Sequence, residues 1–255
     1  MKNILPKSEL LLKKSRPIDK LSTDEAIFLM ADEQQNAALE VKKASKSIEH
    51  AINQIYKHLS LYKKGRLIYV GAGTSGRIGV QDGVELFPTF NWPLGRLDFI
   101  IAGGNKAIIK AIENAEDDIK YAVDEVKRKS INYTDVIIGL AASGDTPFTC
   151  KVLEESLNKQ ALTIAISNNP NGKILNFGKV KIILDTKEEV VAGSTRLKAG
   201  TAQKICLNII STVVMAKMGR VKNGYMNELV VTNEKLRQRK KKIDKEIKKL
   251  DFEKD

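Results

Sequence analysis

The stretch LIYVGAGTSGRIGV, residues 67–80, decides the fold. It joins a short apolar run to a glycine-rich turn and then to residues that suit the first turn of a helix. Four more apolar runs rich in Ile and Val follow, and helix-forming stretches alternate with them. Strands that lack polar alternation are buried on both faces, which is typical of a parallel sheet covered by helices. The sequence therefore predicts an α/β fold with three layers around a parallel sheet.

The pattern also places the individual elements. Strands are expected at 66–71, 97–103, 135–143, 161–167 and 180–185, and helices at 76–85, 105–128, 147–159 and 198–218. Ahead of them, Ser22 and Glu25 match an N-cap and its capping-box partner. They open an additional helical region that runs to about residue 62, with a break expected within ADEQQN, residues 31–36.

Composition narrows the class of protein. The chain has 255 residues, of which 42% are hydrophobic and 29% charged, in keeping with one α/β domain. No signal peptide is recognisable and no apolar stretch is expected to span a bilayer, so we expect a cytoplasmic protein without a membrane partner. Cys150 and Cys206 lie far apart and are expected to be reduced, packed thiols. With only two histidines, acid/base chemistry is expected from carboxylates or lysines, and no metal site is expected.

The net charge of +12 raises the possibility of nucleic-acid binding. Residues 1–20 carry six basic and two acidic side chains, and the last 25 residues carry ten basic and six acidic ones. The excess charge therefore lies mainly at the two ends, and the tail mixes both signs at helical spacing, which favours a solvated helix face. Because aromatic residues make up only 5% of the chain, few stacking platforms exist for single strands. We do not expect a nucleic-acid partner.

Polar, glycine-rich loops follow three of the expected strands. They are GAGTSG at 71–76, AASGDTP at 141–147 and SNNPNG at 167–172. Glycine lets the backbone approach an anion, hydroxyl groups donate to its oxygens, and a helix N-terminus favours negative charge. Because ligands of open α/β sheets bind at the carboxyl ends of the strands, the first two loops together predict a phosphate cradle.

Several interpretations of GAGTSG remain open. The pattern Gly71, Gly73, Gly76 matches a dinucleotide fingerprint, but that site needs an acidic residue at the end of the second strand, and Asp98 lies at its beginning. A P-loop needs Gly-Lys-Ser/Thr, which is absent. A turn that needs glycine only for its shape is the structural alternative. The interpretation that uses both loops is a phosphosugar held by Ser and Thr hydroxyls, and we favour it.

The sequence resembles the N-acetylmuramic acid 6-phosphate etherases, relatives of the glucokinase regulatory proteins that share the SIS (sugar isomerase) fold. The resemblance runs from IDKLST at 18 to TNEKL at 232, and it includes YVGAGTSGRIGVQDGVELFPTF, IAGGNKAIIKAIENAEDD, GLAASGDTP and ISNNPNG. Its most specific part is EVVAGSTRLKAGTAQKICLNIISTVVM, residues 189–215. It implies a homodimeric carbon-oxygen lyase that takes a small phosphosugar and releases D-lactate during peptidoglycan recycling, without a metal or nucleotide cofactor. Residues 1–62 would be a helical segment packed on the core, 63–222 the SIS phosphosugar-binding domain, and 223–255 a lysine-rich helical tail, forming one compact domain overall.

The resemblance also assigns residues. Glu85 occupies the position of the family's catalytic acid, and Glu116 that of the second functional glutamate, the base at C2 of the sugar; Glu113, one turn earlier, is the competing candidate. The apolar neighbours of Glu85 in VELFP are a setting that raises a carboxyl pKa. The residues expected to bind phosphate or other parts of the substrate are Gly73, Thr74, Ser75, Ser143, Gly144, Thr146, Ser194, Arg196 and Lys198. For the last three, a helix cap and an interface ion pair are the structural alternative.

The chain departs from the family pattern in four places. Asp145 stands where AASG is usually followed by Arg, and Lys187 and Glu188 stand where Gly-Pro usually precedes EVVAGSTR. The N-terminal Thr-Glu-x-x-Asn stretch is not recognisable in KSELLLKKS, and the small C-terminal helical domain of many relatives does not follow TNEKL. Two other functions therefore stay open at this point: a non-catalytic phosphosugar sensor of the glucokinase-regulatory type, and an isomerase on the same fold.

Overall fold

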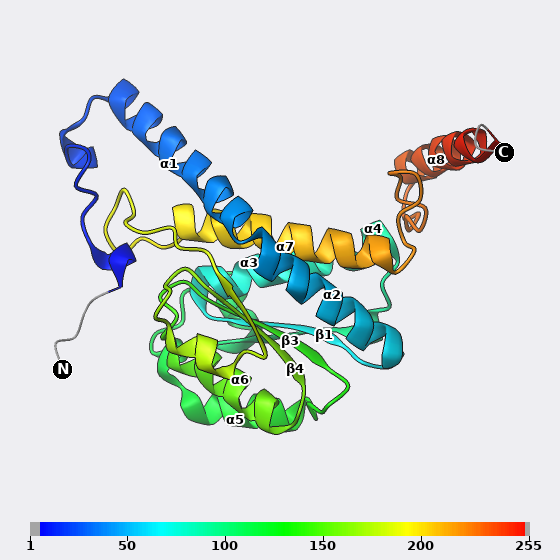
Figure 1. Cartoon of the computed structure of the whole chain (residues 1–255), viewed down its shortest axis with the longest axis horizontal. Helices are drawn as coiled ribbons and strands as arrows, with labels where there is room; N and C mark the ends of the chain where they lie inside the picture. Colours follow the sequence, from blue (N-terminus) through cyan, green and yellow to red (C-terminus); the bar gives the residue numbers. More distant parts are fainter. Residues whose placement is uncertain (1–5, 253–255) are drawn as a thin grey trace.

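A computed structural model describes residues 6–252, and its centre is a five-stranded parallel sheet (Figure 1). The strand order is β2-β1-β3-β4-β5. The strands are β1 Leu67–Gly71, β2 Leu97–Ile101, β3 Val136–Ala141, β4 Leu162–Ser167 and β5 Val180–Ile183. The predicted α/β fold and all five predicted strands are confirmed. The ends of the predicted N-terminal segment and C-terminal tail, residues 1–5 and 253–255, lie outside the described residues.

Helices cover both faces of the sheet (Figure 1). Helices α2 (Ser45–Leu61), α3 (Gly73–Val84) and α7 (Lys198–Lys217) cover one face, and α5 (Ile119–Arg128) and α6 (Pro147–Asn158) cover the other. Alternate residues of each strand enter the two cores, because successive side chains of a strand point to opposite faces. In β3, for example, Ile138 belongs to the core under α2 and α7, whereas Ile137 belongs to the core under α5 and α6.

The N-terminal helical region breaks later than predicted. Helix α1 spans Thr23–Lys43 without interruption, and the Ser22–Glu25 capping box that opens it is present as expected. The predicted break at residues 31–36 is wrong, because that stretch contains no Gly or Pro and consists mainly of residues that tolerate a helix. The break falls at Ala44, which has φ −80° and ψ 7° and joins α1 to α2.

The long helix predicted at 105–128 is also wrong. Only Ile119–Arg128 is α-helical, and the rest is loop with short 3₁₀ turns. Asn114, with φ +56°, has a left-handed conformation that interrupts an α-helix at this point. Before it, the guanidinium group of Arg77 donates hydrogen bonds to the backbone carbonyls of Ala107, Ile108 and Lys110 at 3.0–3.1 Å and so anchors the loop. The 3₁₀ turns of the described chain are Lys7–Glu9, Ile18–Lys20, Leu94–Arg96, Gly104–Ile108, Ala115–Asp117 and Lys173–Phe177.

The remaining helices complete the domain. The short helix α4 (Leu86–Phe90) follows α3, and α8 (Glu234–Phe252) projects from the body beyond α7 (Figure 1). A small apolar cluster of Leu229, Ile243 and Ile247 supports α8. Contrary to the sequence-based expectation, α7 is long and apolar enough to cross a membrane, with 56% of its most apolar window buried in the fold. Its contacts with α1, α2 and α3 identify it as a core helix of this domain.

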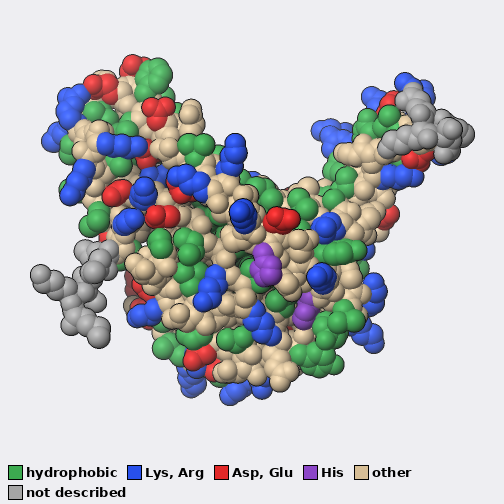
Figure 2. Space-filling view, in the orientation of Figure 1, with side chains coloured by type: hydrophobic (Ala, Val, Ile, Leu, Met, Phe, Trp, Pro, Cys, Tyr) green, Lys and Arg blue, Asp and Glu red, His purple; other side chains and the backbone are tan. Residues whose placement is uncertain are grey.

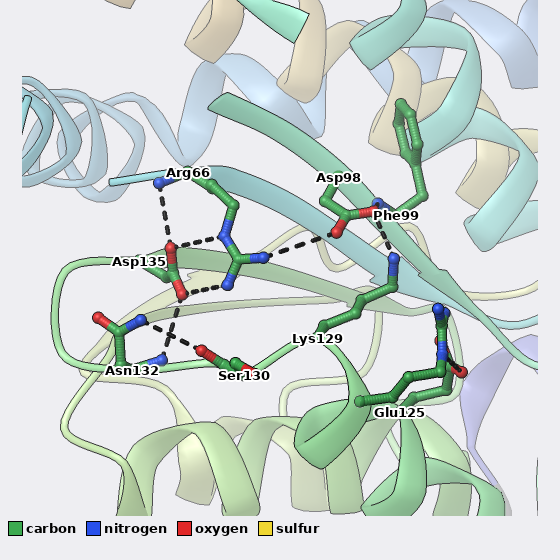
Figure 3. A network of polar contacts seen from close by, with 9 residues as sticks. Arg66, Asp98, Phe99, Glu125, Lys129, Ser130, Asn132 and Asp135 are labelled. Atoms are coloured by element: carbon green, nitrogen blue, oxygen red, sulfur yellow. Dashed lines mark hydrogen bonds and ion pairs between the residues drawn. The ribbon is translucent and has the colours of Figure 1, made fainter. Parts of the chain in front are cut away.

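A polar network ties together the amino ends of the neighbouring strands β2, β1 and β3 (Figure 3). Asp135 is buried and accepts hydrogen bonds from the guanidinium and backbone N–H of Arg66. Asp98, the second residue of β2, pairs with Lys129 at 2.5 Å and lies 3.8 Å from Arg66. Asp98 thus lies at the amino end of the sheet, as predicted, and stabilises the fold on the side opposite to the polar loops.

Candidate functional site

The first polar loop becomes the start of α3. Gly73 has φ +52°, a left-handed conformation that favours glycine, and the helix begins at this residue, three positions before the predicted start. The N-cap residue Ala72 offers no side-chain acceptor to the first N–H groups. Thr74 is half-buried and Ser75 is buried, and neither hydroxyl has a hydrogen-bond partner within residues 6–252. The loop therefore presents backbone and hydroxyl donors at a helix N-terminus, which is suitable for an anion.

The second polar loop is built tightly against the third. Gly144 has φ +79°, and a Cβ atom on it would lie 2.4 Å from Cα of Gly172. Ser143 is held on both sides: Asn169 Nδ2 donates to its backbone carbonyl, and its hydroxyl accepts the backbone N–H of Asp145. Thr146 is the N-cap of α6 but makes no side-chain cap. SNNPNG thus supports the second loop.

The residues Ser194, Arg196 and Lys198 do not form one cluster of free side chains. Ser194 is half-buried and Arg196 is exposed. Lys198 is only 4% exposed, and its ammonium group donates to Glu33 Oε2 at 2.5 Å and to the backbone carbonyl of Glu188 at 2.6 Å. The contacts of Lys198 therefore link α7 to α1, so within one chain the ammonium is already paired.

Glu189 fixes the first turn of α7. Its buried carboxylate accepts the backbone N–H groups of Lys198 and Ala199 at 3.0 and 2.8 Å. Burial raises the pKa of Glu189, while these two N–H donors act in the opposite direction. Acidic groups stabilise helix N-termini, so this glutamate holds the start of α7 and the loop that precedes it.

Glu116 lies on the carboxyl side of the sheet, in the loop that follows β2. It belongs to the 3₁₀ turn Ala115–Asp117 and is exposed, as is Glu113. Asn114, with φ +56°, turns the chain between the two glutamates, so they do not stack on one helix as the sequence suggested. The Arg77 hydrogen bonds attach this loop to α3, the helix whose start carries Thr74 and Ser75.

Glu85 lies at the other end of α3. It joins α3 to α4 and is exposed, so its apolar neighbours do not enclose it within one chain. A helix of 12 residues is about 18 Å long. Glu85 is therefore separated from the Gly73 loop of its own chain by about the length of α3.

Three buried carboxylates near this region were not predicted. Besides Glu33 and Glu189, Asp82 on α3 accepts hydrogen bonds from the hydroxyls of Tyr69 and Ser211 and from the side-chain amide of Asn208. Burial raises the pKa of Tyr69 well above its usual value, and the charge of Asp82 adds to the effect. No spacing rule distinguishes these acids from surface acids, since their partners come from distant parts of the chain.

The two cysteines are free and buried, as expected. Burial raises the pKa of Cys150 to about 11, with a further contribution from the charge of Asp145, and burial raises that of Cys206 to about 12. Both thiols are thus protonated and unreactive at neutral pH. Among residues 6–252, no group of three or more His, Cys, Asp or Glu is placed to hold a metal ion.

The parallel sheet and the glycine- and hydroxyl-rich loops at its carboxyl edge define an SIS domain. A family model described as the glucokinase regulatory protein N-terminal SIS domain matches residues 45–157. A phosphoheptose isomerase from Neisseria gonorrhoeae superposes with a TM-score of 0.56 at 14% identity, over 76% of this chain and 100% of that one. A phosphoheptose isomerase from Francisella tularensis gives a TM-score of 0.54 at 19% identity, over 78% of this chain and 98% of that one.

Relatives of higher identity specify the family. N-acetylmuramic acid 6-phosphate etherase from Mycoplasma mycoides subsp. mycoides SC is 41% identical over 96% of this chain and 81% of its own length. The etherase from Clostridium beijerinckii is 46% identical over 89% of this chain and 74% of its own. The chain belongs to the N-acetylmuramic acid 6-phosphate etherase family.

Proposed function

We propose that this protein is a carbon-oxygen lyase that cleaves the D-lactyl ether of N-acetylmuramic acid 6-phosphate, giving N-acetylglucosamine 6-phosphate and D-lactate. The observation that carries the proposal is the 41% identity to an etherase over 96% of the chain. The exposed Glu116, in the loop that follows β2 on the carboxyl side of the sheet, supports it, because elimination needs a base close to the bound sugar. The protein would act in the cytoplasm on a small phosphosugar from peptidoglycan recycling. We propose no role for a metal, a nucleic acid or a membrane in this reaction.

Substrate binding is assigned to the loops at the carboxyl edge. The first N–H groups of α3 and the hydroxyls of Thr74 and Ser75 would donate to the 6-phosphate, and Gly73 allows the close approach. Ser143 and Thr146 would complete the cradle from the second loop, where Gly144 allows the turn. The exposed Arg196 and the half-buried Ser194 are assigned to the lactyl carboxylate. Lys198 has a supporting role, since its ammonium holds Glu33.

The chemistry is assigned to the two exposed glutamates. With the sugar in its open-chain aldehyde form, Glu116 removes the proton at C2, and the electron pair forms a C2–C3 double bond as the C3–O bond breaks. Glu85 donates a proton to the departing lactate oxygen. Its carboxylate then removes a proton from the water molecule that adds at C3, and Glu116 returns the proton to C2. Such acid/base steps typically contribute about 10²–10⁴-fold to a rate.

The position of Glu85 favours a homodimer. Because the length of α3 separates Glu85 from its own cradle, we propose that each active site combines the loops of one chain with Glu85 of a second copy. An apolar groove of about 540 Å³ between α1, α2 and α7 offers a surface for that contact, with Ile205, Ile209 and Val213 among its lining. The surface is hollowed between the projecting α1 and α8 (Figure 2).

A charge in the groove is expected to prevent dimer formation. Ile209→Asp places a carboxylate on the α7 surface that the second copy would cover, and burying an unpaired charge is costly. We expect the wild type to be a dimer and Ile209→Asp a monomer in size-exclusion chromatography with light scattering. Leu94→Asp is the matched control, because Leu94 is exposed but lies outside the groove. A monomeric wild type, or dimers for both variants, would argue against this interface.

The assignment of the reaction is tested by product analysis. Purified protein is incubated with N-acetylmuramic acid 6-phosphate in H₂¹⁸O, and lactate and sugar are followed by mass spectrometry. We expect D-lactate without label and N-acetylglucosamine 6-phosphate with one ¹⁸O at C3, since the C3–O bond breaks and water adds to C3. Absence of lactate, with binding of the phosphosugar retained, would contradict the lyase and favour a regulator.

A further inference from the structure

The loop that carries Ser143 contains an acidic residue where an anion is proposed to bind. Asp145 lies two residues after Ser143 and one before Thr146, both assigned above to the substrate phosphate. A carboxylate so close to a phosphate repels it unless its charge is engaged elsewhere. The contacts of Asp145 decide between a residue that opposes anion binding and one that supports it.

The carboxylate of Asp145 is engaged by the turn that follows SNNPNG. Its Oδ1 accepts the backbone N–H of Lys173 at 3.0 Å, 28 positions later in the chain. Lys173 is the first residue of the 3₁₀ turn after SNNPNG. A hydrogen bond from a backbone N–H to an ionised carboxylate is among the stronger ones in proteins. Asp145 therefore ties the second polar loop to the third.

Other contacts also hold the second polar loop against the third. The backbone N–H of Ile174 donates to the carbonyl of Gly144 at 2.8 Å, and Asn169 Nδ2 donates to the carbonyl of Ser143 at 2.9 Å. Gly144 and Gly172 touch so closely that neither accepts a Cβ atom. The second loop is thus held against the third from Ser143 to Asp145, and Asp145 contributes a carboxylate to this contact.

The same turn orients the hydroxyl of Ser143. Its oxygen accepts the backbone N–H of Asp145 at 3.2 Å. A hydroxyl that already accepts a hydrogen bond keeps its O–H proton for an acceptor on another side. With Asp145 turned toward Lys173, that proton is available to a phosphate oxygen.

We propose that Asp145 is a positioning residue, whose carboxylate holds the Ser143 loop against the Lys173 turn and so shapes the loop that binds the phosphate of the substrate. The inference rests on the proposed function, because it takes a phosphosugar as the ligand of this loop. It assigns to Asp145 a favourable effect on anion binding despite its negative charge. That effect depends on an acceptor atom at Oδ1 and not on the charge itself.

Two substitutions separate the acceptor from the charge. Asp145→Asn keeps an oxygen acceptor for the Lys173 N–H and removes the charge, whereas Asp145→Ala removes both. We expect Asp145→Asn to bind N-acetylglucosamine 6-phosphate as tightly as the wild type or more tightly. For Asp145→Ala we expect binding weaker by about tenfold, the effect of losing one hydrogen bond that shapes the loop. Binding is measured by calorimetry, with Asp124→Ala as a control at an exposed carboxylate on α5.

Two further readouts distinguish positioning from a general loss of structure. Amide exchange at Lys173 should accelerate in Asp145→Ala and stay slow in Asp145→Asn. In the etherase assay, Asp145→Ala should raise KM by about the same tenfold with little change in kcat. The reason is that the lost contact stabilises the bound substrate and the transition state equally. Thermal unfolding of both variants checks that the fold is intact.

Each outcome decides the inference. Tighter binding by both variants would show that Asp145 only repels the anion, and unchanged binding by both would show that the contact is irrelevant; either result overturns the inference. Equal weakening by both would assign the effect to charge and also overturn it. If binding behaves as expected but the wild type releases no lactate, the lyase proposal fails and the inference stands. If the wild type binds no phosphosugar, both fail.

Discussion

Replacing Glu85 with Gln is expected to reduce lactate release by about 10²–10⁴-fold, the contribution of a general acid and base. The change keeps the size of the side chain but removes the proton that the departing oxygen needs. Because the proposed contacts to the phosphate come from the polar loops and not from Glu85, binding of N-acetylglucosamine 6-phosphate should remain within about twofold of the wild type. Lactate is measured enzymatically and binding by calorimetry.

Glu113→Gln is the matched control for this experiment. Glu113 is an exposed glutamate three positions before Glu116 and the competing candidate for the base, but the resemblance assigns that position to Glu116. We expect it to keep wild-type activity, and we expect Glu116→Gln to lose activity as Glu85→Gln does. Full activity of Glu85→Gln would refute its assignment as the catalytic acid.

Mixing two inactive chains tests whether a second copy supplies Glu85. A Glu85→Gln chain keeps its cradle, and a Thr74→Ala/Ser75→Ala chain keeps its glutamate. In a two-fold symmetric dimer, a mixed pair has one complete site, so random exchange restores about one quarter of the wild-type activity. Activity that stays at the level of the separate variants would place Glu85 and the cradle in the same chain.

Glu33→Ala is expected to destabilise the fold by about 3–5 kcal/mol, because it leaves the Lys198 ammonium buried without its carboxylate partner. Glu33 is 1% exposed and also binds Lys14 at 2.5 Å. Burial alone would raise the pKa of Glu33, but the hydrogen bonds and charges of Lys14 and Lys198 outweigh it and hold the pKa below its usual value. The free energy of unfolding is measured by urea denaturation.

The neighbouring Asp32→Ala serves as the control, since Asp32 is exposed on the same helix and should change stability by less than about 0.5 kcal/mol. The double variant Glu33→Gln/Lys198→Met removes both charges and should recover most of the loss. A carboxylate with a lowered pKa stabilises the fold above its ordinary pKa and loses this effect as the pH falls through the lowered value. The difference between wild type and Glu33→Ala should therefore shrink in acid. Equal stability of Glu33→Ala and Asp32→Ala would contradict the ion-pair account.

The sequence predicted the sheet better than the helices. All five strands follow from runs such as DVIIGLAAS, because burial on both faces leaves a local signal. The helix at 105–128 was wrong because the chain turns at Asn114, and because Arg77, about 30 positions earlier, anchors the loop before that turn. Helix-forming residues alone do not show that a distant side chain anchors their backbone in a loop.

The residues of the candidate site were proposed on two different grounds. Glycine- and hydroxyl-rich loops after strands made Thr74, Ser75 and Ser143 candidates, because the topology of a parallel sheet brings such loops to one edge. Their role in binding stays a prediction. Glu85 and Glu116 came from the family resemblance and not from spacing. The engagement of Lys198 by Glu33 joins residues 165 positions apart, which no local pattern reveals.

The first residues of the described chain contact one of its last loops. Leu11 forms a parallel bridge with Glu189, and the backbone N–H of Gly193 donates to the carbonyl of Ser8. The loop that carries Ser194 and Arg196 thus contacts a segment that is synthesised long before the loop itself. During synthesis this early segment has no partner until nearly the whole domain has emerged. Organisation of this part of the site is therefore a late event in folding, and substitutions in the early segment bear directly on it.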